Sequence, residues 1–488
     1  MAGHSYYEDS YNYNQATGRE FPSDDFKHIT SATIQLGDED ATRYSMESYI
    51  SRLSLGYKNR YLLTATARYD GSSKFAKDNR YATFPAVSLG WVFSEEDFVE
   101  YPEWLNFGKL RASWGKTGNQ DGIGNYAYMP LAAGGYNYNA LTGLSVTNIG
   151  NEHLMWETSE QKNLGIDLTF LGGRLSFTYD YFDKVSDNLL YNVPVLATSG
   201  FTTRTSNIGS MQNTGHEFSV NSTNINRERF SWNTNFNISF IRNKVTSLIG
   251  DEPITVGGWN AIIVGQPLGV MYGYRQLGIY QSLEDIPESL QAEGVRPGDM
   301  IFADLDDNGI INSEDREVIG SALPKFSGGL TNTFNYGNFD VALFTTFSVG
   351  NDIASAWRNG LDHMGARDYN ALATTYHDRW TGPGTSQTVP RVTKSGYNLK
   401  NSSYYVEDAS YFRVKSLTVG YRLPQPWMQQ IGLNNVRVFA TGVNLLTFTN
   451  YSGYDPEASM NTDARSYGVD NLVTPQPRSF MVGLNVNF

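Results

Sequence analysis

The chain has 488 residues, with 37 Lys and Arg against 50 Asp and Glu, and its formal net charge of −13 argues against nucleic acid as a partner. Cysteine is absent, which excludes disulfides, thiolate metal sites and cysteine nucleophiles. Aromatic residues make up 14% of the chain, and no apolar run is long enough for a membrane-spanning helix, so the only membrane-spanning fold left open is a β-barrel.

The beginning of the chain, MAGHSYYEDSYNYN, has neither the basic nor the apolar segment of a secretory signal peptide. No Pro/Ser-rich or single-sign linker divides the residues that follow. We therefore expect one large architecture.

Apolar and polar residues alternate along most of the chain. In the segment ESYISRLSLGY, Tyr49, Leu53 and Leu55 share one face. Arg52 and Ser54 share the other face. Each such segment predicts a β-strand of about nine to eleven residues, the length that a tilted strand needs to cross a bilayer. The same alternation recurs at 61–70, 87–93, 164–170, 175–181, 230–240, 339–347, 417–421 and 480–488.

A single alternating segment fits a soluble β-sandwich as well as a membrane barrel. The lengths of the links between the segments distinguish the two folds. Long and short links alternate, as outer-membrane barrels require for their long extracellular loops and short periplasmic turns. The pattern predicts about a dozen to fourteen antiparallel strands. Counted back from the C-terminus, the links are 446–478 (long), 422–434 (short), 349–409 (long), 336–338 (short), 242–325 (long), 222–229 (short), 184–212 (long), 171–173 (short), 117–158 (long) and 94–105 (short).

This orientation puts the end of the last strand, Phe488, at the periplasmic rim. A terminal aromatic residue is also the signal that barrels present to the barrel-assembly machinery, so the two inferences agree. Tyr and Trp near the strand ends are expected in girdles at the lipid boundaries. The polar face, with Arg52, Arg68 and Arg111, is expected to line a substrate path.

Several stretches resemble one known family. From about residue 45 to residue 488 the sequence resembles the SusC/RagA family of TonB-dependent outer-membrane transporters of Bacteroidota. The resemblance is carried by KLRASWGKTGNQ, WETSEQKNLGIDLTFLGGRLSFTYDYF, PGDMIFADLDDNGIINSEDREVIGSALPKFSGG, YVEDASYFRVKSLTVGYRLP and VFATGVNLLTFTNYSGYDPE, in this order.

The resemblance implies a 22-stranded transmembrane barrel, an N-terminal plug, energy from TonB, and a SusD-like lipoprotein that captures glycans or, in some members, peptides. This sequence shows no plug, TonB box or leader, and too few strands for that barrel. Residues 1–488 are therefore expected to form the C-terminal part of such a barrel in the outer membrane. Contact with TonB is expected only through a plug that this chain does not contain.

The segment DLDDNGIINSED, residues 304–315, has the ligand spacing of a calcium loop within the expected extracellular connection 242–325. Gly309 permits the sharp turn, and Asp315 is shorter than the usual bidentate Glu. An Asx/Gly-rich turn is the alternative. We expect a structural calcium ion that orders the loop. Its ligands would be Asp304, Asp306, Asn308, the carbonyl of Ile310, Asn312 and Asp315.

A second candidate site is the tyrosine-rich stretch 125–139. Its rings are expected to stack on sugars in an external loop, with loop packing or partner contact as the alternative. The tyrosines are Tyr126, Tyr128, Tyr136 and Tyr138.

No catalytic constellation is found, so we expect a protein that is not an enzyme. Nutrient import by part of a TonB-dependent barrel explains the sequence best. Two alternatives remain: a self-contained passive porin of about fourteen strands, and a calcium-dependent surface module that binds glycans or acts as an adhesin.

Overall fold

A computed structural model describes every residue except 99, 140, 251, 431 and 488. Phe488, the expected assembly signal, therefore lies outside the described residues. Fourteen strands form one large sheet, and their order in the sheet is their order in the chain. They are β1 (Ala2–Arg19), β2 (Ile34–Tyr57), β3 (Tyr61–Ser72), β4 (Tyr81–Trp91), β5 (Leu105–Asn119), β8 (Glu157–Phe170), β9 (Leu175–Asp187), β12 (Ser210–Arg227), β13 (Phe230–Ser247), β20 (Phe326–Tyr336), β21 (Phe339–Val349), β24 (Tyr411–Arg422), β25 (Asn435–Thr449) and β27 (Ser479–Asn487).

The antiparallel all-β fold expected from the alternation is confirmed. Neighbouring strands pair antiparallel, for example β2 with β3, β20 with β21, and β25 with β27. A bulge between Phe344 and Thr345 shifts the register of β21 against β24. No described helix is both long and apolar enough to cross a membrane.

Ten of the fourteen strands are longer than expected, while β4, β20, β21 and β27 fall within the expected range. The sequence predicts about nine to eleven residues each, whereas β2 has 24, β12 and β13 have 18, and only β27 is as short as nine. The apolar and polar alternation marks only the part of a strand with lipid on one face. Beyond the membrane both faces meet water, so the pattern fades while the backbone pairing continues. For the same reason β1, with its 18 residues, was not predicted.

The alternation of long and short links is confirmed from residue 120 to the last strand, with long links 120–156, 188–209, 248–325, 350–410 and 450–478. It does not hold for the first strands. There the link 73–80 is shorter than the link 92–104, although the first lies at the end with long loops and the second at the end with short turns.

The chain divides into two compact units. The first comprises Met1–Val92, Arg111–Leu164 and Lys184–Ser210. Its core is a cluster in which Trp156 packs on Phe75 and Phe84, with ring centroids 5.1 and 5.5 Å apart. It also contains two hairpins, β6 (Leu131–Ala133) with β7 (Ser145–Asn148), and β10 (Leu190–Pro194) with β11 (Thr203–Asn207).

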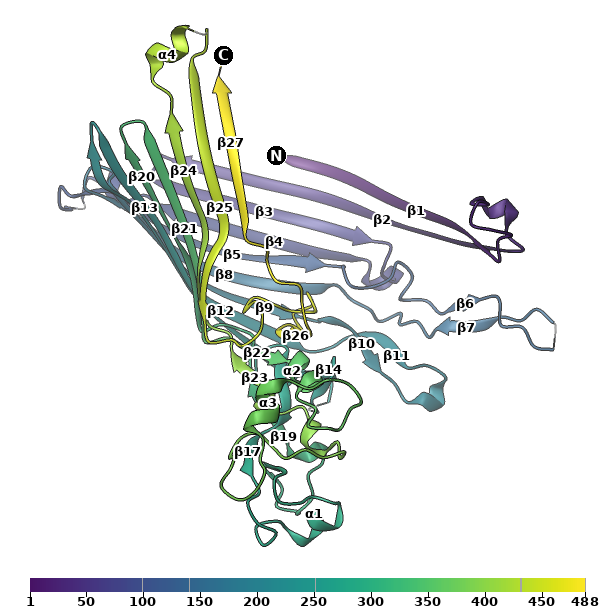
Figure 1. Cartoon of the computed structure of the whole chain (residues 1–488). Coiled ribbons are helices and arrows are strands. Elements are labelled where there is room, and N and C mark those ends of the chain that lie inside the picture. Colours follow the sequence, from purple (N-terminus) through teal and green to yellow (C-terminus); the bar gives the residue numbers. More distant parts are fainter. Residues whose placement is uncertain (99, 140, 251, 431, 488) are drawn as a thin grey trace. The chain divides into compact units, whose positions relative to one another are not determined.

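The second unit comprises Phe93–Leu110, Gly165–Asp183 and Met211–Phe488. Its long loops fold into short elements with hydrophobic cores of their own, gathered beyond one end of β20, β21 and β24 (Figure 1). These elements are β14 (Ile254–Val256), β15 (Asn260–Ile262), β16 (Val270–Tyr274), β17 (Gln276–Ile279), α1 (Glu288–Ala292), β18 (Met300–Phe302), β19 (Arg316–Gly320), β22 (Asp352–Ser355), α2 (Ala356–Leu361), α3 (Ala373–Asp378), β23 (Val406–Asp408) and β26 (Val469–Asp470); α4 (Gln425–Gln430) lies in the link between β24 and β25.

The large sheet has one apolar face and one polar face. In the first unit, Leu53 and Leu55 of β2 are 52% and 54% exposed on the apolar face. Arg52 of β2 lies opposite Thr66 of β3 on the polar face. In the second unit, Phe480 and Val482 of β27 are 77% and 79% exposed. Large apolar side chains that remain exposed along whole strands are typical of a face that meets lipid.

Candidate functional site

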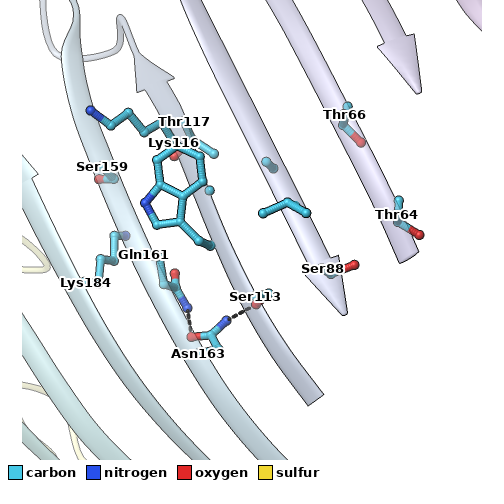
Figure 2. Close-up of a pocket in the computed structure, with 14 residues that line it drawn as sticks. Thr64, Thr66, Ser88, Ser113, Lys116, Thr117, Ser159, Gln161, Asn163 and Lys184 are labelled. Carbon is cyan, nitrogen blue, oxygen red and sulfur yellow. Dashed lines mark hydrogen bonds between the residues drawn. The ribbon is translucent and has the colours of Figure 1, made fainter. Parts of the chain in front are cut away.

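The polar face of the first unit carries a cavity of about 310 Å³ on β3, β4, β5, β8 and β9 (Figure 2). Successive side chains of a strand point to opposite faces, so every second residue of each strand reaches the same surface. On β3 and β8 the lining positions alternate along the strand and hold hydroxyl and amide side chains, whereas on β4 and β5 consecutive residues, 86–88 and 113–117, line the cavity. The lining residues are Thr64, Thr66, Ala86, Val87, Ser88, Ser113, Trp114, Gly115, Lys116, Thr117, Ser159, Gln161, Asn163 and Lys184.

Hydrogen bonds within and between strands hold the lining side chains in place. The Gln161 Nε2 donates to Asn163 Oδ1 at 2.9 Å, and the Asn163 Nδ2 donates to Ser113 Oγ at 3.3 Å (Figure 2). The Ser159 hydroxyl contacts that of Ser186 at 2.9 Å. Such a wall offers donors and acceptors along its length, which suits a solute rich in hydroxyl or amide groups.

The two lysines at this cavity differ in their ion pairs. Lys116 lies 3.2 Å from a carboxylate oxygen of Glu160, which neutralises it. Lys184 forms no ion pair with any residue that the structure describes. Its ammonium group is thus available to an anionic group of a bound solute.

The three arginines named from the sequence lie on this same polar face. Arg52 is opposite Thr66, and Arg111 is two residues before Ser113 on β5. Arg68 has its guanidinium 3.1 Å from the buried carboxylate of Asp70. The sequence reasoning found the face but did not single out the hydroxyl and amide residues of the cavity. The polar positions in the stretches 113–117 and 159–163 were the available signal.

In the second unit the polar face continues into a smaller cavity of about 210 Å³ near the short turns. Its side chains are mostly amides and hydroxyls: Asn221, Ser222, Thr223, Asn233, Thr234, Asn235, Thr331 and Thr333, with Arg174 and Ser176. Each unit therefore carries a polar surface that can hold water or a polar solute.

The predicted calcium loop runs from β18 into β19, without the two flanking helices of an EF-hand. Carboxylate oxygens of Asp304, Asp306 and Asp315 lie within 4.8 Å of one another. Gly309 has φ of +77°, as the sharp turn requires, and Asp307, two residues earlier, also has positive φ, at +55°.

Backbone N–H groups already orient these carboxylates. Asp304 accepts from the N–H of Gly309 at 2.7 Å. The fully buried Asp315 accepts from the N–H groups of Leu305 and Asn312, both at 2.8 Å. The Asn312 side chain accepts from the N–H of Glu314 and so caps the short 3₁₀ turn Ser313–Asp315.

The negative charge of the acidic loop is not balanced by a cation. Within the described part of the chain, no Lys, Arg or His forms an ion pair with Asp304, Asp306 or Asp315. Burial raises the pKa of Tyr280 in the adjacent core, and the charge of Asp304 raises it further. The hard oxygens of this cluster are of the kind that Ca²⁺ binds.

The structure separates the four predicted tyrosines into two pairs. The hydroxyl of Tyr126 accepts from the backbone N–H of Arg43 at 3.1 Å, and Tyr128 packs against the core around Trp156. Tyr136 and Tyr138, beyond β6, are 55% and 83% exposed. Only the second pair thus presents free ring faces.

A family model described as TonB dependent receptor-like, beta-barrel matches residues 2–445. The chain belongs to this β-barrel family. It is 33% identical over 533 residues to TonB-dependent receptor P39 of Formosa agariphila, a match that covers 100% of this chain and 51% of the relative. It is 32% identical over 468 residues to TonB-dependent receptor SusC of Bacteroides thetaiotaomicron, covering 92% of this chain and 44% of the relative.

The barrel fold is also that of a solved structure. The structure of the RagAB peptide transporter superposes with a TM-score of 0.87 at 24% identity, covering 100% of this chain and 53% of that chain. The resemblance to the SusC/RagA group is therefore confirmed, and the chain is part of an outer-membrane β-barrel. The relatives it matches are receptors and transporters rather than enzymes, and the chain spans about half the length of the curated ones.

Proposed function

We propose that the protein containing this chain imports a nutrient, an oligosaccharide or a peptide, across the outer membrane, and that this chain supplies barrel wall rather than catalysis. The observation that carries the proposal is the polar face, which holds a cavity in each unit while the opposite face is apolar. In this assignment the polar face lines the lumen, the end with long loops is extracellular, and TonB acts through a plug.

Import is tested in cells that lack the gene and are complemented with it. Uptake of radiolabelled maltoheptaose and of a labelled peptide mixture is measured with and without a protonophore. Gene-dependent uptake that stops when the proton gradient collapses supports TonB-driven import. Gene-dependent uptake that continues identifies the alternative, a passive porin. Surface binding without uptake identifies the other alternative, an adhesin.

We further propose a SusD-like lipoprotein as partner, bound in part by the hairpin of β6 and β7. Residues 131–149 contain no charged side chain. Tyr138, Leu141 and Leu144 are 83%, 72% and 79% exposed. Contiguous exposed apolar side chains of this kind mark contact surfaces between proteins.

The partner proposal is tested by co-purification from outer membranes, with the lipoproteins identified by mass spectrometry. Leu141→Ser together with Leu144→Ser is expected to reduce recovery of the lipoprotein severalfold. Leu196→Ser, on the other loop of the same unit and 81% exposed, is the matched control. Unchanged recovery with the double variant contradicts this contact.

We also propose that the acidic loop binds one structural calcium ion through the ligands predicted from the sequence. The convergence of three carboxylates without a cationic partner supports it. Ca²⁺ would neutralise the cluster and stiffen the loop core, and millimolar calcium outside the cell fills even a weak site of this type.

Calorimetric titration of Ca²⁺ into the full-length protein in detergent tests this site. The wild type is expected to release heat at one site per chain, and Asp304→Asn with Asp306→Asn is expected to abolish it. Asp24→Asn with Asp25→Asn, an exposed acidic pair in another loop, is the control. Heat that survives the first double variant rejects the assignment.

A further inference from the structure

The second unit has a cavity of a different chemistry. It measures about 440 Å³ and lies where three loops meet the strands β12 and β13. Its lining residues are Met211, Asn213, Asn243, Pro267, Leu268, Gly269, Ala322, Leu323, Pro324, Thr462, Ala464 and Tyr467. None is charged, and most of the wall is hydrocarbon.

The strand residues place this cavity on the polar face. Asn213 is separated by an even number of residues from Asn221, and Asn243 from Asn235, and both Asn221 and Asn235 line the smaller polar cavity. Alternation therefore points all four amides to one surface. In the proposed orientation this cavity lies at the outer end of the lumen, where a solute arrives before it passes through.

The loops that form the apolar wall are fixed. The N–H of Leu268 donates to the Asn243 side chain at 2.6 Å. The buried amide of Asn260 donates to the carbonyl of Gly269 at 2.9 Å and to that of Tyr467 at 3.2 Å. A Cβ at Gly269 would lie 2.5 Å from the carbonyl oxygen of Ala464, so only glycine allows these two loops to approach so closely. A preformed wall costs little conformational entropy when a ligand binds.

Of the four polar side chains that line the cavity, Asn213, Asn243, Thr462 and Tyr467, the two strand asparagines bond each other. The Asn243 Nδ2 donates to the Asn213 Oδ1 at 2.7 Å, and the Asn243 Oδ1 already accepts from Leu268. A sugar ring in this space would bury several hydroxyl groups with few partners, which is unfavourable. An apolar group has no hydrogen bonds to lose in this cavity, and the flexible thioether of Met211 can adapt to its shape.

We propose that this cavity is a recognition subsite for a bulky apolar side chain of a peptide, such as leucine or phenylalanine. The amide protons of Asn213, which no described residue accepts, and the hydroxyl of Thr462 lie at the same wall. They suit the backbone of an extended peptide whose side chain enters the cavity. The inference rests on the proposed import function and adds to its peptide alternative a specificity for apolar side chains.

The test is a calorimetric measurement of ligand binding to the purified full-length protein in detergent. The probes are the peptide Gly-Ser-Gly-Leu-Gly-Ser-Gly, the same peptide with Ser in place of Leu, and maltoheptaose. The leucine peptide is expected to bind about tenfold or more tightly than the serine peptide, because burying a leucine side chain contributes at least one factor of ten.

Ala464→Trp fills the exposed rim of the cavity and is expected to abolish the preference for the leucine peptide. Leu268→Ser keeps the backbone bond to Asn243 and is expected to weaken the preference severalfold. Ala371→Trp, at an exposed alanine of the same unit that does not line the cavity, is the matched control and is expected to leave it unchanged.

Three outcomes overturn the subsite: equal affinity for the two peptides, a preference that survives both cavity variants, or maltoheptaose binding that depends on Ala464. Because the binding assay does not depend on transport, it can reject the subsite without rejecting import. The uptake assay can likewise reject import without rejecting the subsite. A preference that depends on Ala464, without uptake in cells, removes the import function and keeps the subsite. Energy-driven uptake, without such a preference, does the opposite.

Discussion

The polar cavity of the first unit and the apolar cavity of the second both lie on the polar face of the large sheet, but their walls differ. The first is walled by strands alone, with Thr64, Ser113 and Gln161 among its residues. The second begins on the same type of strand residue, Asn213 and Asn243, but loops add Pro267, Leu268 and Pro324. Strand alternation therefore fixes which face is polar, and the loops decide whether a cavity on that face takes polar or apolar groups.

This difference also predicts how each cavity responds to damage. A cavity walled by strands is held by the hydrogen bonds of the sheet, so it should survive the loss of a loop. A cavity walled by loops depends on the few contacts that fasten those loops.

The largest effect is expected for Arg413→Ala in the second unit. Arg413 is 2% exposed, and its guanidinium lies 2.6 Å from Asp455 and 2.5 Å from Glu457, both in the loop that carries Ala464 and Tyr467. Removing one partner of a buried ion pair costs about 3–5 kcal/mol because a buried carboxylate, here that of Asp455, is left without its cation. Glu457 keeps Lys415 at 3.8 Å. We expect the loop 450–478 to become protease-sensitive and the preference for the leucine peptide to be lost.

The control for this variant is Arg465→Ala, whose ion pair with Asp463 is 40% exposed on the Arg side and 42% on the Asp side. Exposed pairs contribute about 0–1 kcal/mol, so little change is expected. Limited proteolysis and thermal unfolding of the full-length protein report both variants. A stable, protease-resistant Arg413→Ala protein would show that other contacts fasten the loop.

The second prediction is made for Trp156→Ala in the first unit. Trp156 is 5% exposed, packs on Phe75 and Phe84, and donates its indole N–H to the carbonyl of Arg80 at 3.0 Å. Truncation of a buried Trp costs about 3–5 kcal/mol. We expect the loop 120–156 to loosen while binding at the polar cavity stays unchanged, in contrast to Arg413→Ala. Hydrogen exchange of the loop and sialyllactose binding measure the two effects. Affinity lost together with the loop would contradict the contrast.

The same contrast explains what the sequence could predict. Residues that alternate along a strand, such as Leu53 and Leu55, reveal the fold because lipid and water impose the period of two. The carboxylate cluster of the acidic loop 304–315 was also predictable, because its residues are close together in sequence. The apolar cavity was not, because Asn213, Leu268 and Ala464 are brought together from distant segments, and no local pattern encodes that meeting.

Lys184→Gln is expected to have a smaller effect, restricted to anionic solutes. Lys184 lies at the polar cavity without an ion-pair partner among the described residues. Its attraction for a carboxylate in a solvated site amounts to about 1 kcal/mol or less and weakens with salt. Sialyllactose affinity should fall by a few fold at low salt, while lactose affinity stays constant. Lys394→Gln, at an exposed loop position, is the control. An equal loss for both sugars would mean that Lys184 acts through structure rather than charge.

The smallest effect is expected from pH acting on Asp352, beside the apolar cavity. Asp352 accepts from the N–H of Ser321 at 3.0 Å, next to the lining residue Ala322, and burial raises the pKa of its carboxyl above 3.8. Because the folded-state pKa is raised, the folded state favours the protonated form. Stability from this group is fully present below pH 3.8, the ordinary value, and is lost as pH rises through the folded pKa.

Asp352→Asn retains an oxygen that can accept from Ser321 but removes the charge. At pH 7 the variant is therefore expected to be more stable than the wild type by about 1 kcal/mol or less, and the advantage should shrink as the pH approaches 4. Asp368→Asn, at an exposed loop position of the same unit, is the control. If thermal unfolding shows an advantage for Asp352→Asn that is independent of pH, the cause is packing rather than the buried charge. If it shows none, the carboxylate at the edge of the apolar cavity is solvated well enough to be harmless, and the apolar wall does not extend to Ser321.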